Sequence, residues 1–278
     1  MDKEYVGKVV AELYGNLPGN IISEEMDVDK AYVGIPMYDA PIIGFGAAND
    51  PLFEEFKNPG IIGPWHMSPT EWLPEAKTVI SLFFPMSAPV RLSNRESTES
   101  ASVLWTYARI EGQEYIHSFM KHLAEWFDNQ GILTCVPSAD PRFQQVSAGR
   151  GIEGYPDIKN STYGSRWSER HAAFVSGLGT FGLSKGLITR KGMAGRFGSV
   201  IVGELFAADV RPYSDTYEYC TRCGACIARC PALAIDLENG KDHTKCGPFV
   251  KASGVLHRPR YGCGLCQTGV PCESSIPG

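Results

Sequence analysis

The cysteines of this 278-residue chain are concentrated in one region, and this distribution constrains the fold more than any other feature. Eight of the nine cysteines lie at positions 220–278. The N-terminus, Met1-Asp2-Lys3-Glu4, lacks the basic stretch and apolar core of a secretory signal, which predicts a cytoplasmic protein. Since a reducing cytosol disfavours disulfides, the crowded cysteines predict metal ligation.

Half of the clustered cysteines form the pattern C-x2-C-x2-C-x3-C-P, at Cys220, Cys223, Cys226 and Cys230. This is the spacing of bacterial ferredoxins, in which the first three thiolates bind one 4Fe–4S cluster and the fourth binds another. A zinc site usually takes paired C-x2-C knuckles and has no use for a third cysteine at this step. The motif therefore predicts iron–sulfur clusters.

The other clustered cysteines, Cys246, Cys263, Cys266 and Cys272, supply the thiolates that a second cluster needs. By the crossed ligation of bacterial ferredoxins, we expect two sets. The first set is Cys220, Cys223, Cys226 and Cys272, and the second set is Cys230, Cys246, Cys263 and Cys266. The alternative is one cluster plus a zinc ion at the last four cysteines. Two neighbouring clusters form an electron-transfer chain, which implies a donor at one end and an acceptor at the other.

The amino-acid composition narrows the classes of protein to which the chain can belong. Hydrophobic residues make up 43% and charged residues 21%, as in a globular protein, which excludes a disordered chain. The net charge of -5 disfavours a nucleic-acid partner, because proteins that bind polyanions usually carry a basic surplus. No apolar run approaches the roughly 20 residues of a membrane helix.

Apolar periodicity predicts a mixed α/β chain. Ile116, Met120, Leu123 and Phe127 form one helical stripe, and the run at 77–84 is typical of a buried strand. The polar stretch at 86–100 predicts a loop. We expect helices at 3–14, 48–57, 101–129 and 168–176, and strands at 77–84, 132–136, 187–190 and 198–205. The change to Cys, Gly and Pro divides the chain into 1–210 and 211–278.

The segment from Gly177 to Gly182 matches the dinucleotide-binding pattern G-x-G-x-x-G. That site needs a preceding strand and an acidic residue about 20 positions further on. Here a helical stretch precedes the segment and position 202 is Val. We therefore interpret the glycines as a tight turn, which either lets a flat cofactor approach the backbone or serves packing alone.

Several segments resemble the superfamily of epoxyqueuosine reductases and reductive dehalogenases. They are Leu73-Pro-Glu-Ala-Lys-Thr-Val-Ile-Ser-Leu82, Tyr107-Ala-Arg109 with Glu114-Tyr115, Glu169-Arg170, and Gly177-Leu-Gly179 with Gly182, followed by the two cysteine sets. The resemblance spans roughly 70–272. It implies a nitroreductase-like, corrinoid-binding α/β domain that receives electrons from a C-terminal two-cluster ferredoxin domain. It also implies that a reduced cobalamin removes oxygen or halide from a substrate.

The resemblance identifies candidate site residues in the same chain. Epoxyqueuosine reductases carry an Asp seven residues before the Arg of the Glu-Arg pair, and that position here is Tyr163. Reductive dehalogenases use a Tyr as the proton donor, so we expect Tyr163 to donate a proton with the help of Arg166. The alternative is that Tyr163 packs on the surface and Arg166 is solvated. The tight turn supplies the candidate cofactor-binding residues Gly179, Phe181, Gly182 and Ser184.

The resemblance implies a reductase that takes electrons from a low-potential ferredoxin or flavodoxin. The helical-repeat extension of epoxyqueuosine reductases is missing and the charge is acidic, which favours a small substrate over tRNA. Trp167 to His171 are expected to line the site, with His171 either an auxiliary acid or a structural residue. Two alternatives are an electron-transfer protein that activates a partner's corrinoid and a flavin-dependent reductase.

Overall fold

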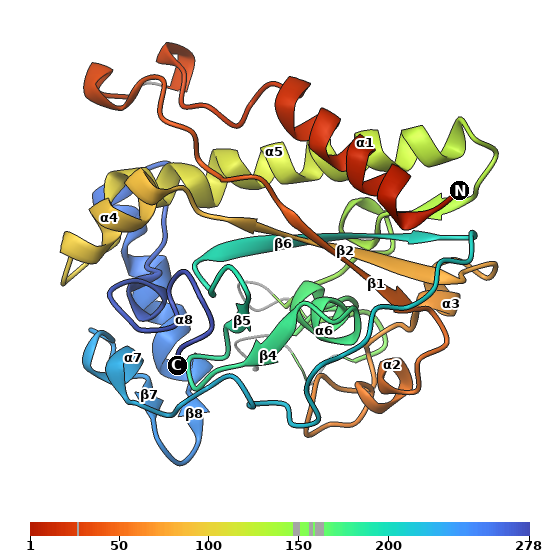
Figure 1. Cartoon of the computed structure of the whole chain (residues 1–278). Helices are drawn as coiled ribbons and strands as arrows, with labels where there is room; N and C mark the ends of the chain where they lie inside the picture. Colours follow the sequence, from red (N-terminus) through yellow and green to blue (C-terminus); the bar gives the residue numbers. More distant parts are fainter. Residues whose placement is uncertain (27, 147–150, 156–157, 159–163) are drawn as a thin grey trace.

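The computed structural model describes residues 1–26, 28–146, 151–155, 158 and 164–278. Its centre is a four-stranded sheet in the order β1-β2-β6-β3, in which every neighbouring pair is antiparallel (Figure 1). The strands are β1 (Ile42–Ala47), β2 (Thr78–Pro85), β6 (Gly195–Val202) and β3 (Thr134–Cys135). Together with the helices described below, this sheet confirms the predicted mixed α/β class.

Strand β2 is the buried centre of the sheet. All of its residues are buried, and it pairs with β1 on one side and with β6 on the other. A continuous apolar run suits a strand that is covered on both faces, which is why the sequence predicted it within one residue at each end. Strand β1 was not predicted, because its two glycines weaken the β pattern. A side chain at Gly44 would collide with the carbonyl oxygen of Ser176.

Helices α1 (Lys3–Asn16) and α5 (Val103–Asp128) cover one face of the sheet (Figure 1). The predicted stripe from Ile116 to Phe127 is buried in the largest hydrophobic cluster. The Ser102 side chain caps α5 by accepting a hydrogen bond from the backbone N–H of Trp105. The predicted helices at 3–14 and 101–129 are therefore confirmed.

Helix α6 (Glu169–Val175) and a hairpin of β4 (Gly179–Phe181) and β5 (Leu187–Thr189) lie on the other face (Figure 1). Helix α6 contacts both β2 and β6. Gly179 belongs to this hairpin, and a side chain there would collide with the carbonyl oxygen of Ile188. The glycine pattern thus serves close packing, one of its two predicted roles.

The short elements differ most from the expectation. The helix predicted at 48–57 is reduced to α2 (Leu52–Glu55), and α3 (Pro69–Trp72) follows it. The loop predicted at 86–100 is wrong, because α4 (Ala88–Glu96) occupies most of it. Asn94 is buried in α4, donates to Thr268 Oγ1 and accepts from the backbone N–H of Ser102. Tertiary contacts therefore hold a helix that its polar composition did not indicate.

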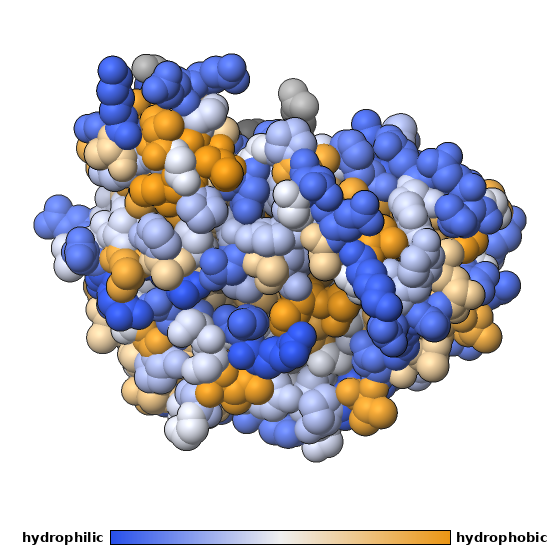
Figure 2. Space-filling view, turned by 45° about the horizontal axis from the view of Figure 1, so that its top comes forward, coloured by the Kyte–Doolittle hydropathy of each residue, from blue (hydrophilic) through white to orange (hydrophobic). Residues whose placement is uncertain are grey.

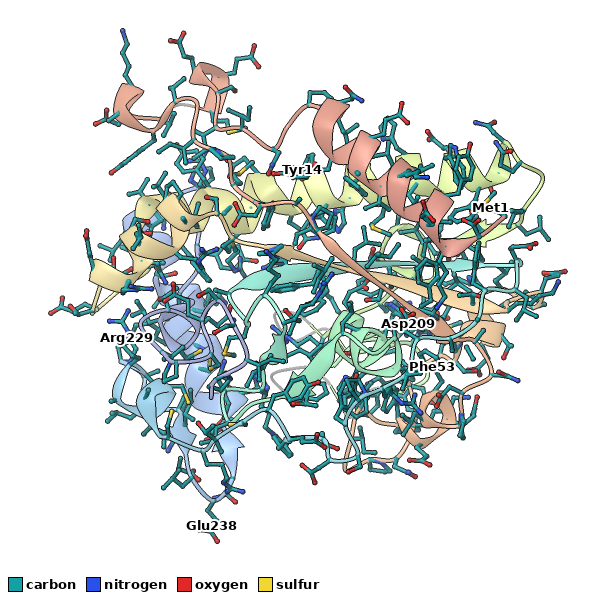
Figure 3. All side chains as sticks on the ribbon, viewed as in Figure 1. Met1, Tyr14, Phe53, Asp209, Arg229 and Glu238 are labelled. Atoms are coloured by element: carbon teal, nitrogen blue, oxygen red, sulfur yellow. The ribbon has the colours of Figure 1, made fainter. Side chains whose placement is uncertain are left out.

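The C-terminal part lies at one end of the sheet, next to α4 (Figure 1). It contains α7 (Ala225–Ala228), β7 (Ile235–Asp236), β8 (Gly240–Lys241), α8 (His243–Ala252), α9 (Gly254–His257) and the 3-10 helix η5 (Leu265–Gln267). Its hydrophobic cluster is small and includes Cys230 and Cys266 together with Leu183 of the larger part. Figure 3 shows sulfur atoms gathered in this region. The division at residue 210 stays a prediction.

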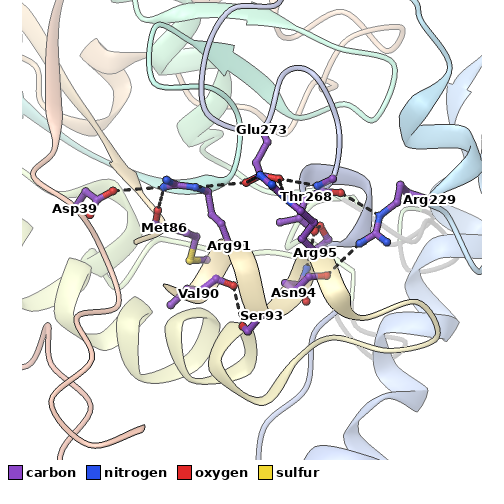
Figure 4. A network of polar contacts seen from close by, with 12 residues as sticks. Asp39, Met86, Val90, Arg91, Ser93, Asn94, Arg95, Arg229, Thr268 and Glu273 are labelled. Atoms are coloured by element: carbon purple, nitrogen blue, oxygen red, sulfur yellow. Dashed lines mark hydrogen bonds and ion pairs between the residues drawn. The ribbon is translucent and has the colours of Figure 1, made fainter. Parts of the chain in front are cut away.

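A buried carboxylate joins the two parts (Figure 4). Glu273 is 3% exposed and forms ion pairs with Arg95 at 2.8 Å and Arg91 at 3.6 Å, both from α4. Its Oε2 also accepts from the backbone N–H of Gly269 at 2.6 Å. Arg229 adds hydrogen bonds to the carbonyl oxygens of Thr268 and Asn94. These contacts fix the C-terminal segment on α4.

Backbone hydrogen bonds hold the same segment against the residues that lead into β6. The N–H groups of Met193 and Ala194 donate to the carbonyl oxygens of Cys272 and Glu273 at 2.9 and 3.1 Å. Gly192 has a positive φ of 74°, and any side chain there would collide with Glu273. The position of Cys272 is therefore set by the larger part of the protein.

Hydrophilic side chains surround several separate groups of hydrophobic ones on the face shown in Figure 2. Among the residues that the structure describes, no helix is long and apolar enough to cross a membrane.

Replacing Glu273 with glutamine removes the charge that Arg91 and Arg95 share, so we expect the free energy of unfolding to fall by about 2 kcal/mol. Urea unfolding followed by tryptophan fluorescence measures this loss. The control is Glu238→Gln, since Glu238 is exposed between β7 and β8 (Figure 3) and its replacement should cost less than about 0.5 kcal/mol. Equal stabilities for the two variants would contradict the proposed role of Glu273.

Candidate functional site

The structure brings the first cysteine set together around a narrow space of about 20 Å³. Cys220, Cys223, Cys226 and Cys272 line it, together with Gly182. Positive φ angles at Arg222 (52°) and Gly224 (77°) bend the backbone around the motif. Cys272 comes from the distant C-terminal segment, and its Sγ lies 3.2 Å from Met193 Sδ.

The second cysteine set forms one wall of a larger cavity. Cys230, Cys246, Cys263 and Cys266 all line this cavity. The backbone N–H of Ala234 donates to Cys230 Sγ, and Lys241 Nζ donates to Cys266 Sγ, both at 3.4 Å. The two sets predicted by crossed ligation therefore line two different spaces.

The electrostatic neighbours of Cys272 and Cys263 follow the same two sets. Burial raises the pKa values of Cys272 and Cys263 to about 12, and neighbouring thiols of the same set act in the same direction. For Cys272 these neighbours are Cys220, Cys223 and Cys226, whereas for Cys263 they are Cys230, Cys246 and Cys266. Each set can thus supply four thiolates to a cationic centre, which would favour the ionised form.

Each of the two spaces is lined by four cysteines, the number of thiolates that a 4Fe–4S cluster binds. Among the described residues, no three His, Cys, Asp or Glu side chains are close enough to hold one metal ion. A zinc ion binds each sulfur at about 2.3 Å, so its four thiolates must nearly touch. A 4Fe–4S cluster binds one thiolate at each of its four iron atoms and therefore keeps its ligands further apart. The donor sets fit such clusters.

The two sets are neighbours, but they face different surroundings. Burial raises the pKa of Cys226 to about 11, and the largest contribution from another charged group comes from Cys266 of the second set. Cys223 of the first set is exposed, and it is the only exposed one among the described cysteines. The first set therefore reaches the surface, and the second set faces the large cavity.

The large cavity has a volume of about 620 Å³, within the range of roughly 300–1,000 Å³ that ligand pockets occupy. Helix α5, strand β6 and the start of α6 form its other walls. Its charged and polar lining includes Arg109, Gln113, Glu114, His117, Glu169, Arg170, Arg196 and Lys241. The cavity is thus open to the second cysteine set and rich in hydrogen-bond donors.

Two cations of this lining contact uncharged side chains. Arg109 stacks on the ring of Tyr261 at 4.0 Å, and Arg196 Nε donates to Gln113 Oε1 at 2.6 Å. Within the described parts of the chain, no carboxylate forms an ion pair with Arg109, Arg170 or Lys241. A ligand with negative charge or carbonyl oxygens would find donors on this lining.

Glu169 is the candidate that sequence reasoning did not recognise as a proton carrier. Trp167 Nε1 donates to Ser199 Oγ at 2.9 Å, and Ser199 Oγ donates to Glu169 Oε2 at 2.6 Å. The other oxygen, Oε1, is buried and has no hydrogen-bond partner among the described residues. Burial raises the pKa of Glu169 to about 7, so its carboxyl group can take up and release a proton near neutral pH. Segments far apart in the chain bury Glu169, so no local sequence pattern indicates its raised pKa.

Comparisons with known proteins agree with this architecture. Residues 214–236 match the family model described as a 4Fe-4S binding domain. An epoxyqueuosine reductase solved with a tRNA-TYR stem loop is 18% identical over 85% of this chain, with a TM-score of 0.51. That from Streptococcus thermophilus is 16% identical over 98% of this chain, with a TM-score of 0.52. The catabolic reductive dehalogenase NpRdhA is 12% identical over 85% of this chain, with a TM-score of 0.53.

The chain has the fold that epoxyqueuosine reductases and reductive dehalogenases share. This confirms the structural side of the predicted resemblance. The chain covers 62% and 66% of the two epoxyqueuosine reductases and 30% of the dehalogenase. A search of curated protein sequences gave no match.

The structure describes only one residue of the expected catalytic pair, Arg166. Tyr163 lies outside the described residues. Arg166 donates to the carbonyl oxygens of Arg142 and Glu153 at 3.1 and 3.3 Å and forms an ion pair with Glu153 at 3.8 Å. It is not among the residues that line the large cavity. The structure therefore gives Arg166 a role in holding the loop, and its action beside Tyr163 stays a prediction.

The four residues expected to contact a corrinoid lie outside the lining of the large cavity. Gly179 is closed against β5, and Phe181 packs on the ring of His171 at 4.8 Å. Gly182 and Ser184 line the narrow space beside the first cysteine set. The hairpin thus faces the first set, and contact of these four residues with a cofactor stays a prediction.

His66 and His171 both pack against the ring of Phe56, and His66 also stacks on Trp167, which lines the cavity. Burial lowers the pKa of His171 to about 3, so His171 is neutral near pH 7 and is the structural residue of the two predicted alternatives. His66 is 2% exposed and stacks on Trp167 at 5.8 Å. Neither ring nitrogen of His66 has a hydrogen-bond partner in the described structure. Burial lowers its pKa to about 4.

A histidine pKa that is lowered by folding stabilises the protein above the unfolded value of about 6.5, and this stability is lost as the pH falls towards 4. We therefore expect His66 to account for about 2 kcal/mol of the stability lost between pH 7 and pH 5. Urea unfolding at both pH values should show a smaller loss for His66→Phe. His122→Gln changes an exposed histidine and should behave as the unmodified protein. A full loss in His66→Phe would refute the assignment.

Proposed function

We propose that this protein is a cytoplasmic iron–sulfur reductase with two 4Fe–4S clusters and a corrinoid in the large cavity. Its reaction would be the reductive removal of halide or oxygen from a small substrate. The observation that carries this proposal is the cavity wall made by Cys230, Cys246, Cys263 and Cys266. A wall of cluster ligands gives electrons direct access to whatever the cavity holds.

The arrangement of the cysteines from the surface to the cavity supports one direction of electron flow. The exposed Cys223 marks the side where a ferredoxin or flavodoxin would dock. Cys226 and Cys266 lie near each other where the two sets meet. Cys266 then faces the cavity. This arrangement leads from the surface through both sets to the cavity.

The cavity residues fit a corrinoid in their chemistry. A corrinoid carries peripheral amides and a phosphate, and Arg109, Arg170 and Lys241 offer donors without a carboxylate partner among the described residues. When bound, the corrinoid would supply the reducing cobalt centre. The net charge of -5 favours a small substrate over the tRNA bound by one structural neighbour.

Two side chains are proposed to handle the proton. Tyr163 is the proposed donor, as the resemblance to reductive dehalogenases implies. Glu169 lines the cavity, and its pKa, which burial raises to about 7, lets it take up and release a proton near neutral pH. We propose Glu169 as the source of the proton that replaces the one donated by Tyr163.

The first test is a cofactor titration. Clusters are reconstituted anaerobically, iron and sulfide are counted, and cobalamin is added before gel filtration. We expect about eight irons per chain, as two 4Fe–4S clusters require, and one retained base-off corrinoid. Eight irons without retained corrinoid would favour the electron-transfer protein, and a yellow chromophore released on denaturation would favour the flavin enzyme.

A second test follows once a substrate has been found by screening. Tyr163→Phe should abolish turnover and leave the reduction of the clusters by dithionite intact. Glu169→Gln should lower turnover and weaken its dependence on pH near 7, because glutamine cannot hold the proton. Unchanged turnover in either variant would exclude that residue from proton transfer.

A further inference from the structure

One lysine points at a ligand of the second cysteine set. Lys241 lies on β8, where it pairs with Ile235 of β7, and its Nζ donates to Cys266 Sγ at 3.4 Å. Gly240 precedes it with a positive φ of 69°, and a Cβ there would lie only 3.0 Å from the carbonyl oxygen of Leu183. The short hairpin is therefore held closely against the larger part of the protein, and its geometry fixes the lysine beside the sulfur.

The charge of Lys241 is not neutralised by a described carboxylate. Its neighbour Asp242 turns away, because its Oδ1 accepts from the backbone N–H and the hydroxyl of Thr244 at the start of α8. The groups of opposite sign that act on Lys241 are Cys266 and Cys246, both of the second set. The ammonium group thus directs its charge at two ligands of one centre.

The first set has no such neighbour in the described structure. In the described structure, the side chain that contacts a sulfur of the first set is that of Met193, whose Sδ lies next to Cys272 Sγ. A thioether carries no charge. The two sets have the same four-thiol chemistry but different electrostatic surroundings. A cation and a hydrogen bond at a cluster sulfur stabilise the reduced, more negative state.

We propose that Lys241 raises the reduction potential of the cluster held by the second set and so favours electron flow from the surface to the cavity. The cluster gains one electron from the neighbouring cluster, and the ammonium keeps its proton. Lys241 would act on the cluster through its ligand Cys266 and would not itself contact the substrate. This inference rests on the two-cluster part of the proposed function and does not depend on the corrinoid.

The test is a redox titration, followed by electron paramagnetic resonance, of the full chain with reconstituted clusters and no cobalamin. In Lys241→Met, one of the two midpoint potentials should move to a more negative value while the other stays unchanged. Lys241→Arg should keep both potentials close to those of the unmodified protein. Lys251→Met is the matched control, because Lys251 is exposed on α8 and should change neither potential.

The outcomes separate the two proposals. Eight irons with unchanged potentials in Lys241→Met, or with equal shifts of both, would overturn the role of Lys241 and leave the two-cluster proposal standing. About four irons in the unmodified protein would overturn both. If Lys241→Met fails to take up its second cluster, Lys241→Gln decides, since it keeps a hydrogen-bond donor without the charge and should show a negative shift of one potential.

Discussion

The attachment of the C-terminal segment to α4 and to the residues just before β6 is the contact on which the rest of the structure depends. Glu273 is buried between Arg91 and Arg95, and its backbone pairs with Ala194. Cys272 precedes Glu273 and completes the first cysteine set. Removing one member of a buried ion pair leaves an uncompensated charge, so this contact is far less tolerant than a surface pair. The larger part of the protein thereby determines the geometry of a centre whose ligands all come from the C-terminal part.

Burial controls the chemistry of the site at several points. It raises the pKa of Glu169 to about 7 and lowers the pKa values of His66 and His171 far below neutrality. Two histidines are therefore removed from acid–base chemistry, and a carboxyl group takes the range that histidine usually occupies. The hydrogen-bond chain from Trp167 through Ser199 to Glu169 connects the acid to β6, the strand that also lines the cavity.

The sequence was most informative where local spacing decides structure. A fully apolar run predicted β2, an unbroken stripe predicted α5, and the cysteine spacing predicted the two sets that the structure brings together. Prediction failed where distant segments decide. Helix α4 exists because Asn94 bonds to Thr268, and the glycines of β1 make room for Ser176. The cations of the cavity and the burial of Glu169 come from elements far apart in the chain, so no local pattern could reveal them.

The crossed arrangement of the cysteines has a consequence for biosynthesis. Three ligands of the first set are translated within seven residues, Cys220 to Cys226, yet the set is incomplete until Cys272 has emerged from the ribosome. The second set has all its ligands earlier, once Cys266 has been translated. The second set, which faces the cavity, is thus complete in the chain before the first set, which reaches the surface. In the proposed two-cluster protein, the ligand sets would therefore be completed in the reverse of the order in which electrons would pass through the clusters.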